Sequence, residues 1–204
     1  MTLCLVTQRQ RQDPVDQARR AAAAGIDLIQ IRERDLDAAP LSTIVRGVVA
    51  AARAAARTRV VVNDRVDVAL ACGADGVHLR GDSVAAEAVR RIVPPGFVIG
   101  RSVHSVEDAR AAGPVDYVIA GTVFPSATKG KDAPVIGIDG LAAIVRASTA
   151  PVLAIGGITP ERAAAVASVG ASGIAAIGLF ATGGSLSEAV DGLRTRFDSV
   201  KTAP

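Results

Sequence analysis

The hydrophobic positions of the chain fall into two kinds of segment that alternate along its length. Alanine-rich stretches end at a glycine, and a short apolar run begins about two residues later. This junction occurs at Ala21–Gly25, Ala69–Gly73, Ala109–Gly113 and Ala164–Gly170. A glycine closes a helix at low cost because it adopts the left-handed conformation without a steric penalty. The pattern therefore predicts helices alternating with the strands of a parallel sheet.

Completing the pattern along the chain gives eight strands and eight helices. The predicted strands are Leu3–Thr7, Leu28–Arg32, Val60–Asn63, Gly76–Leu79, Val98–Gly100, Tyr117–Ala120, Val152–Ile155 and Ile174–Ile177. The predicted helices are Pro14–Ala24, Ala38–Arg57, Val66–Cys72, Val84–Val93, Val106–Ala112, Ile138–Ala147, Pro160–Ser168 and Leu186–Phe197. Eight such units predict a compact (β/α)8 TIM barrel, an α/β fold, as one domain over residues 1–204. An open, doubly wound sheet is the alternative, but it would need a topological switch point.

Composition narrows the class of protein. Half of the 204 residues are apolar, only 2% are aromatic, and there is no Trp, so the chain is poorly suited to stacking nucleic-acid bases. The formal charge of +3 without a polybasic tail suits a small anionic substrate. Cys4 and Cys72 lack metal-ligand spacing and are expected to be buried free thiols. With no signal peptide and no bilayer-length apolar run, we expect a cytoplasmic protein with neither nucleic acid nor membrane as partner.

Active sites of TIM barrels lie beyond the carboxyl ends of the strands. Polar side chains gather there: Gln30, Arg32, Arg34, Asn63, Asp64, His78, Arg80, Asp82, Ser102 and His104. Gln30, Arg32 and Arg34 alternate along the predicted second strand, so they should share one face. Because an unpaired buried guanidinium is costly and Arg forms a fork with phosphate, we predict a clamp for a phosphate or diphosphate. Internal pairing of these arginines with Glu33 or Asp64 is the alternative.

Two aspartates at the same edge could bind a divalent cation. Asp64 follows the third strand and Asp82 follows the fourth, and Mg2+ prefers such carboxylates when it bridges to substrate phosphates. Alternatively, Asp64 caps the helix that begins near Val66. The histidines offer acid/base chemistry at His104, whereas His78 ends an apolar strand and is typical of a satisfied core group. Ser102 could donate to an anion or cap the following helix.

Two loops have the composition of phosphate-binding segments. Gly121–Lys131 follows the sixth strand and contains Ser126, Thr128 and Lys129, which can surround one anion with hydroxyls, main-chain N–H groups and an ammonium. Gly156-Gly157 follows the seventh strand, and Ile177 and Gly178 at the end of the eighth would form the matching wall. The alternatives are a solvated surface loop and a simple tight turn.

Five motifs resemble, in order, those of the thiamin phosphate synthase and thiazole tautomerase (TenI) superfamily: Gln30-Ile-Arg-Glu-Arg34, Asn63-Asp-Arg-Val-Asp67, Gly76-Val-His-Leu79, Pro125-Ser-Ala-Thr-Lys129 and Ile155-Gly-Gly-Ile158. The resemblance runs from the first strand to the eighth and implies a (β/α)8 barrel. By resemblance to the synthases, the chain would couple hydroxymethylpyrimidine diphosphate to thiazole phosphate with Mg2+. Diphosphate would leave first, and the thiazole nitrogen would then attack the pyrimidine cation.

The resemblance also implies roles for individual residues. The diphosphate and pyrimidine would be held by Gln30, Arg32, Arg34, Asn63, Ser126, Thr128 and Lys129. Asp64 would hold the metal, and Gly156, Gly157, Ile177 and Gly178 would hold the thiazole phosphate. Asp82 precedes the family's second metal position and remains the candidate second ligand. Catalysis through positioning and electrostatic stabilisation is expected from Arg32, Lys129, Ser102 and His104. The family further implies a homodimer.

Three positions depart from the synthase pattern: Arg34 replaces Lys, Ser83 stands where the second metal-binding Asp is expected, and Gly178 replaces Ser. The tautomerase branch isomerises a thiazole carboxylate phosphate by proton transfer. Its pattern shares Ile31–Arg34 and Gly100–Ser105 with this chain, but it has a histidine at the position where this chain has Thr122. The loop after the sixth strand and the Asn63-Asp64 pair favour the synthase. A non-catalytic barrel that binds thiazole phosphate for regulation is a third hypothesis.

Overall fold

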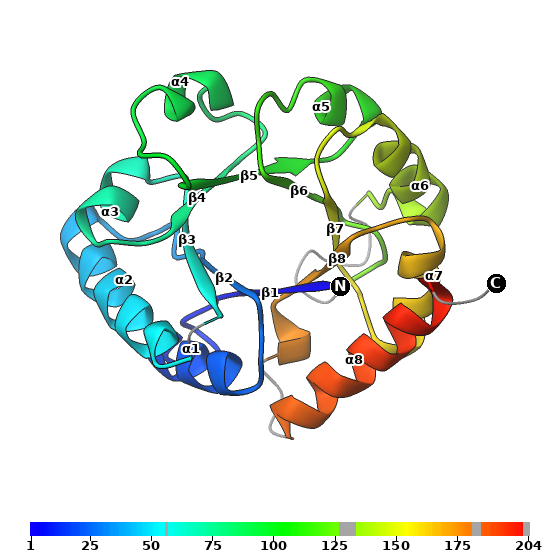
Figure 1. Cartoon of the computed structure of the whole chain (residues 1–204), viewed down its shortest axis with the longest axis horizontal. Coiled ribbons are helices and arrows are strands. Elements are labelled where there is room, and N and C mark those ends of the chain that lie inside the picture. Colours follow the sequence, from blue (N-terminus) through cyan, green and yellow to red (C-terminus); the bar gives the residue numbers. More distant parts are fainter. Residues whose placement is uncertain (56, 127–133, 181–184, 202–204) are drawn as a thin grey trace.

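Eight parallel strands form one closed barrel in the computed structural model, which describes residues 1–55, 57–126, 134–180 and 185–201. The strands follow one another around the ring in chain order, and β1 closes it by pairing with β8 (Figure 1). Their bounds are β1 Thr2–Val6, β2 Leu28–Ile31, β3 Arg59–Asn63, β4 Gly76–Leu79, β5 Val98–Val103, β6 Tyr117–Gly121, β7 Val152–Ile155 and β8 Gly173–Ala176. The predicted TIM barrel is confirmed.

Helices surround the strand ring and follow each strand in turn (Figure 1). Their bounds are α1 Pro14–Ala23, α2 Ala38–Arg53, α3 Val66–Ala71, α4 Ala86–Arg90, α5 Val106–Arg110, α6 Gly137–Ala147, α7 Ala163–Ser168 and α8 Leu186–Lys201. Two short 3-10 helices, η1 Pro160–Arg162 and η2 Gly178–Phe180, follow β7 and β8 along the chain. The predicted second and fourth helices were too long, because alanines and valines favour burial without marking where a helix ends. None of the helices described here is long and apolar enough to cross a membrane.

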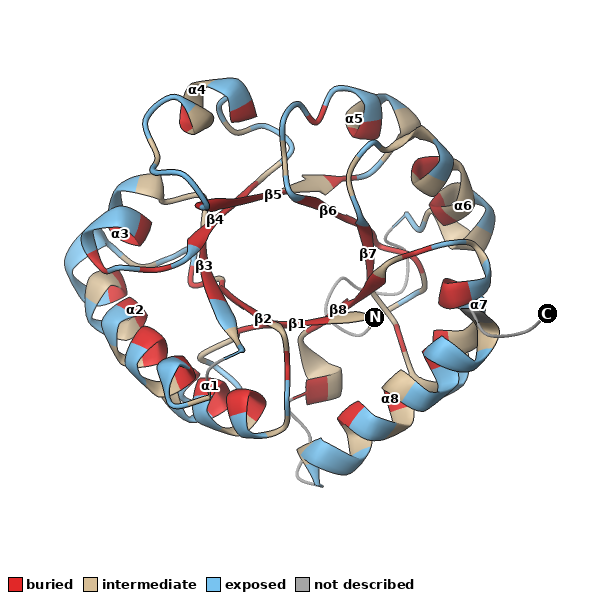
Figure 2. Cartoon of the chain, in the orientation of Figure 1, coloured by how far each residue is buried: buried red, intermediate tan, exposed pale blue. Residues whose placement is uncertain are grey.

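Two layers of apolar side chains hold the barrel together. On β1, Leu3 and Leu5 belong to a cluster that includes helix residues such as Leu41 and Val45, so this face packs under the helices. Cys4 and Val6 belong to a second cluster drawn from strands alone, which fills the barrel interior. Figure 2 shows burial concentrated in the strands and on the helix faces turned toward them. Both cysteines are buried free thiols, as predicted, and burial raises the pKa of Cys4 to about 12.

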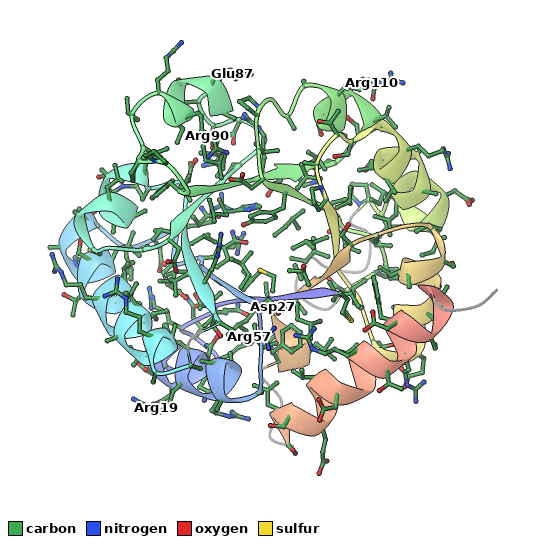
Figure 3. All side chains as sticks on the ribbon, viewed as in Figure 1. Arg19, Asp27, Arg57, Glu87, Arg90 and Arg110 are labelled. Carbon is green, nitrogen blue, oxygen red and sulfur yellow. The ribbon has the colours of Figure 1, made fainter. Side chains whose placement is uncertain are left out.

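Glycines that end helices, and aspartates that accept hydrogen bonds from a neighbouring strand, recur at the amino ends of the strands. The glycines that end α1, α3, α5 and α7 have φ values between 69° and 87°, as the recurring junction predicted. An aspartate shortly before β2, β4 and β6 accepts a hydrogen bond from the first part of the preceding strand: Asp27 from Leu3 N, Asp75 from Val60 N and Asp116 from Ile99 N, at 2.7–2.8 Å. Arg194 also pairs with Asp27, and Arg90 with Asp116. Asp27 and Arg90 lie on opposite sides of the ring, so the arrangement recurs around it (Figure 3).

Candidate active site

A cavity of about 1120 Å³ lies at the carboxyl ends of the strands. Its charged lining residues are five arginines and two aspartates: Arg11, Arg32, Arg34, Arg80, Arg162, Asp82 and Asp108. Asp82 pairs with Arg80, and Asp108 accepts hydrogen bonds from the main chain at His104 and Ser105. The cavity therefore carries an excess of positive charge, which concentrates small anions near it.

Arg32 and Arg34 line this cavity without pairing to any described residue. The prediction that they continue the second strand was wrong, since β2 ends at Ile31 and only Gln30 lies on it. Internal pairing is also contradicted. Glu33 is buried and turns toward Thr7 Oγ1 (2.7 Å) and the main-chain N of Arg9 (3.1 Å). Burial, and then the nearby Arg34, lower the pKa of Arg32, yet a guanidinium stays charged at neutral pH.

Gln30 and Asn63 form a polar pair in the cavity wall. They lie on the neighbouring strands β2 and β3, and Gln30 Nε2 donates to Asn63 Oδ1 at 3.0 Å. This bond leaves Gln30 Oε1 as a free acceptor and Asn63 Nδ2 as a free donor. An acceptor and a donor side by side suit the edge of a heterocycle that carries an amino group next to a ring nitrogen.

Ser102 ends a hydrogen-bonded chain that runs through the barrel interior. Its Oγ lies 2.9 Å from His78 Nε2, and His78 Nδ1 lies 3.0 Å from the hydroxyl of Tyr117. Burial, and then Arg32, lower the pKa of His78 to about 3, and burial raises that of Tyr117 well above its usual value. Both groups are thus neutral, and His78 is the satisfied core group that was predicted. Ser102 lines the cavity and does not cap α5, because Ser105 forms that capping box.

The hydrogen atoms along this chain can be placed by counting acceptors. The hydrogen of the buried Tyr117 hydroxyl needs an acceptor, and His78 Nδ1 is its partner in the described structure. We therefore assign the phenol as the donor and Nδ1 as the acceptor. His78 Nε2 then carries the ring hydrogen and donates to Ser102 Oγ. The hydrogen of Ser102 is left over, and it is available to a ligand in the cavity.

The two candidate metal ligands are held by neighbouring side chains. Asp64 adopts a left-handed conformation (φ 58°), and its carboxylate accepts from Ser83 Oγ and lies 3.7 Å from Arg80 Nη1. Arg80 Nη2 pairs with Asp82. Capping of α3 by Asp64 was wrong, since Arg65 occupies the N-cap position and no side chain caps that helix. No group of three or more potential His, Cys, Asp or Glu ligands converges among the described residues.

The loop after β7 is fixed by its glycines and by Arg162. Gly156 and Gly157 have φ values of 102° and 60°, and a Cβ on Gly157 would lie 2.4 Å from the carbonyl oxygen of Pro125. Arg162 Nη1 donates to the Gly157 carbonyl at 2.6 Å, and its guanidinium lies 4.5 Å from the ring centroid of Phe124. The tight turn is real, and both glycines also line the cavity.

The remaining predicted residues divide into two groups. Ser126, Ile177, Gly178 and His104 line the cavity. His104 Nδ1 contacts the carbonyl oxygen of Gly121, which leaves Nε2 without a partner in the described part of the chain. Thr128 and Lys129 lie outside the described residues.

The sequence-based predictions gave no role to Arg80, Arg162 or Tyr117, although all three shape the site. Arg80 and Arg162 line the cavity, and Tyr117 contacts His78, which lines it. Arg80 was one of many polar residues at a strand end, and nothing in the sequence revealed its two aspartate partners. Arg162 follows Pro160 in what resembled an ordinary helix start. Tyr117 begins β6, far from the predicted mouth, and it reaches His78 only because Gly100 leaves room: a Cβ there would lie 2.1 Å from the tyrosine ring.

Comparison with known proteins places this geometry in context. The family described as thiamine monophosphate synthase matches residues 3–180. A thiamine-phosphate synthase of Methanoculleus marisnigri is 41% identical over 91% of this chain and 89% of its own length. One from Azorhizobium caulinodans is 36% identical over 96% and 94%, respectively. The solved structure of a thiamine phosphate pyrophosphorylase from Pyrococcus furiosus has a TM-score of 0.85 and 35% identity, covering 98% of this chain and 96% of that one.

Proposed function

The chain belongs to the thiamine monophosphate synthase family, and we propose that it couples hydroxymethylpyrimidine diphosphate to thiazole phosphate, releasing diphosphate. One observation carries the assignment of the site: the guanidinium groups of Arg32 and Arg34, which pair with no described residue, line the same positive cavity as the Gln30–Asn63 pair. In this proposal residues 1–204 act as one domain on two small phosphorylated substrates.

The diphosphate is assigned to the side of the cavity formed after β2 and β5. Arg32 and Arg34 have free forks that suit phosphate oxygens, and the hydrogen of Ser102 is available nearby. Ser126, which also lines the cavity, and the sequence positions Thr128 and Lys129 are proposed to complete this subsite. Arg32 is half-buried and has no partner among the described residues, and such a guanidinium is costly unless an anion occupies the site, which supports this assignment.

The pyrimidine is assigned to Gln30 and Asn63. Its ring nitrogen would accept from Asn63 Nδ2, and its amino group would donate to Gln30 Oε1, because the bond between the two side chains leaves those atoms free. The thiazole phosphate is assigned to Gly156, Gly157, Ile177 and Gly178, where the absence of side chains lets the main chain approach an anion. Arg162 fixes this loop through the Gly157 carbonyl.

The chemistry then needs one bond to break and one to form. The C–O bond between the pyrimidine methylene and the diphosphate breaks, and the electron pair leaves with the diphosphate. The thiazole nitrogen supplies the pair for the new C–N bond. Arg32 and Arg34 stabilise the charge that develops on the leaving group, and the two subsites hold the reacting atoms in line. His104 and Ser102 are proposed as polar groups beside the leaving diphosphate.

Mg2+ is the cofactor that the family implies, and the side chains present fit it poorly. A magnesium ion typically binds through one or two carboxylates together with substrate phosphates. Here Arg80 pairs with both Asp64 and Asp82, and Ser83, at the position of the second carboxylate in the synthase pattern, donates to Asp64. In the proposed reaction the leaving diphosphate is therefore stabilised by the protein's own side chains.

The direct test is formation of thiamine phosphate from the two purified substrates, followed by chromatography. Asn63→Asp replaces the proposed pyrimidine donor with an acceptor, so it should abolish most turnover while thiazole phosphate still binds. Asp191→Asn on the exposed face of α8 is the matched control and should leave turnover unchanged. Absence of product from folded wild-type protein that binds both substrates would reject the proposal.

A thiazole tautomerase is the second candidate, and His104 is the observation that favours it. Its Nε2 has no partner in the described structure and its ring lines the cavity, so it could transfer a proton to a bound thiazole. Isomerisation of a thiazole carboxylate phosphate that is lost in His104→Ala, without synthase turnover, would establish this activity. Binding of thiazole phosphate without either reaction would instead indicate a regulatory barrel.

A further inference from the structure

Arg80 occupies an unusual position between two carboxylates at the end of β4. Its Nη1 lies 3.7 Å from Asp64 Oδ2, and its Nη2 pairs with Asp82. The main-chain N of Arg80 donates to Ser83 Oγ at 2.8 Å, and Ser83 Oγ donates to the other oxygen of Asp64. Four residues therefore form one closed network, in which a fixed positive charge sits between the two acidic groups.

This network competes with a divalent cation for the same oxygens. Both oxygens of Asp64 are engaged, one by the Ser83 hydroxyl and one by Arg80, and the nearest oxygen of Asp82 is engaged as well. A metal ion would have to displace a guanidinium that stays protonated at every working pH. It would also meet that positive charge at close range, which opposes its binding.

The same guanidinium faces the cavity. Arg80 is only partly exposed (41% of its side chain) and lines the cavity that Arg32 and Arg34 also line. Two of its nitrogens serve the aspartates, and a guanidinium has five N–H donors in all, so donors remain for an anion in the cavity. Three guanidinium groups around one diphosphate can supply the positive charge that a metal ion would otherwise bring.

We propose that Arg80 takes the electrostatic place of a divalent metal in this chain, so that the leaving diphosphate is stabilised by protein side chains without a metal ion. The proposal rests on the proposed synthase function for its kinetic consequence. Its structural consequence, that Asp64 and Asp82 do not bind a divalent cation while Arg80 is present, stands independently of that function.

The kinetic test compares turnover of metal-stripped wild-type protein in EDTA with turnover in saturating Mg2+. We expect the two rates to agree within about threefold, and Arg80→Met to lose about 100-fold in EDTA, the scale for removing one preorganised charge. Arg65→Met is the matched control, because Arg65 lies beside the same loop but pairs with Asp67 at the surface. Product from wild type only when Mg2+ is present would overturn the proposal.

The binding test uses Mn2+ as a probe, followed by electron paramagnetic resonance without substrate. Wild-type protein should bind no Mn2+, whereas the double variant Arg80→Gly, Ser83→Asp, which removes the guanidinium and adds a carboxylate, should bind it. Equal Mn2+ binding by wild type and by this variant would overturn the proposal even if no product is ever detected. If folded wild-type protein gives no product in either EDTA or Mg2+ and binds no Mn2+, the synthase function and the kinetic consequence are rejected. The structural consequence, that Asp64 and Asp82 bind no divalent cation while Arg80 is present, is then supported.

Discussion

The two ends of the barrel handle charge in opposite ways. At the amino end, Asp27, Asp75 and Asp116 each accept a main-chain hydrogen bond, and two of them also pair with arginines from outside the ring. At the carboxyl end, Arg32 and Arg34 face a cavity with no described partner. Charge that is satisfied within the fold stabilises it, whereas a half-buried charge without a described partner, as at Arg32, is costly unless an anion binds beside it. The amino end therefore holds the barrel together, and the carboxyl end is where we propose that the anionic substrates bind.

Arg32→Ala should produce the largest effect that this contrast predicts. We expect kcat/KM for thiamine phosphate formation to fall by about 10²- to 10³-fold, because a preorganised charge beside the leaving group is lost. The thermal midpoint should stay the same or rise, since an unpaired, partly desolvated guanidinium is removed. Steady-state kinetics and thermal unfolding measure the two quantities on the same preparation.

The matched control for Arg32 lies at the other end of the barrel. Arg59 also has no described partner, but it is exposed, so water solvates its guanidinium. Arg59→Ala should change neither kcat/KM nor the thermal midpoint. If Arg32→Ala lowers stability but leaves turnover intact, Arg32 stabilises the fold and does not bind substrate, which contradicts the role proposed for the carboxyl end.

Asp116→Ala should show the opposite signature. Its carboxylate accepts from Ile99 N at 2.7 Å and from Arg90 at 2.9 Å, so truncation leaves a strand N–H and a guanidinium without this partner. We expect the free energy of unfolding to fall by about 1–3 kcal/mol, with kcat/KM unchanged. Urea unfolding measures the change, and Asp191→Ala, on the exposed face of α8, is the control. A loss of turnover in correctly folded Asp116→Ala would show that the amino end contributes to catalysis.

His78 gives the barrel interior a pH dependence of its own. Its pKa is lowered to about 3 in the folded protein, against an ordinary value of 6.5, so the unfolded chain binds more protons between these values. Its contribution is therefore fully present above pH 6.5 and is lost as the pH falls toward 3. Between pH 6 and 5 the free energy of unfolding should fall by roughly 1 kcal/mol from this group.

His78→Gln separates this effect from the titration of surface carboxylates. The variant should be less stable at pH 7, but its free energy of unfolding should change less between pH 6 and 5 than that of wild type. Urea unfolding at both pH values measures the difference. Equal slopes for the two proteins would mean that His78 is protonated in the folded state, contrary to its buried position between Tyr117 and Ser102.

The sequence predicted the fold well because the relevant signals are local. A glycine at a helix end and an apolar run after it are properties of adjacent residues, and they located every strand to within a few residues. The same locality explains the errors. The helix predicted over Ala38–Arg57 ends at Arg53, and Arg32 and Arg34 lie beyond β2, because the end of an element depends on what packs against it.

The sequence predicted many of the residues that line the cavity, but it did not predict which of their side chains pair with one another. Residues after the strand ends do line the cavity, since a parallel barrel brings all of its carboxyl ends together. Which charge pairs with which depends on distances between strands that the sequence does not encode locally. Arg80 is separated from Asp64 by a whole βα unit, and Tyr117 reaches His78 across the interior only because Gly100 lacks a side chain.

Gly178→Ser should have the smallest effect, because it adds a side chain at the carboxyl end where the structure leaves space for one. A Cβ at Gly178 would meet no atom within 4 Å, whereas one at Gly157 would overlap the main chain of Pro125. The serine should therefore leave the thermal midpoint unchanged, while Gly157→Ala, the contrasting variant, should lower it. Since the added hydroxyl can donate to an anion in the cavity, we expect KM for thiazole phosphate to fall by less than about tenfold, the scale of one added hydrogen bond. A loss of stability in Gly178→Ser would mean that the space beside β8 is already filled, and an increase in KM would move the thiazole phosphate away from that wall.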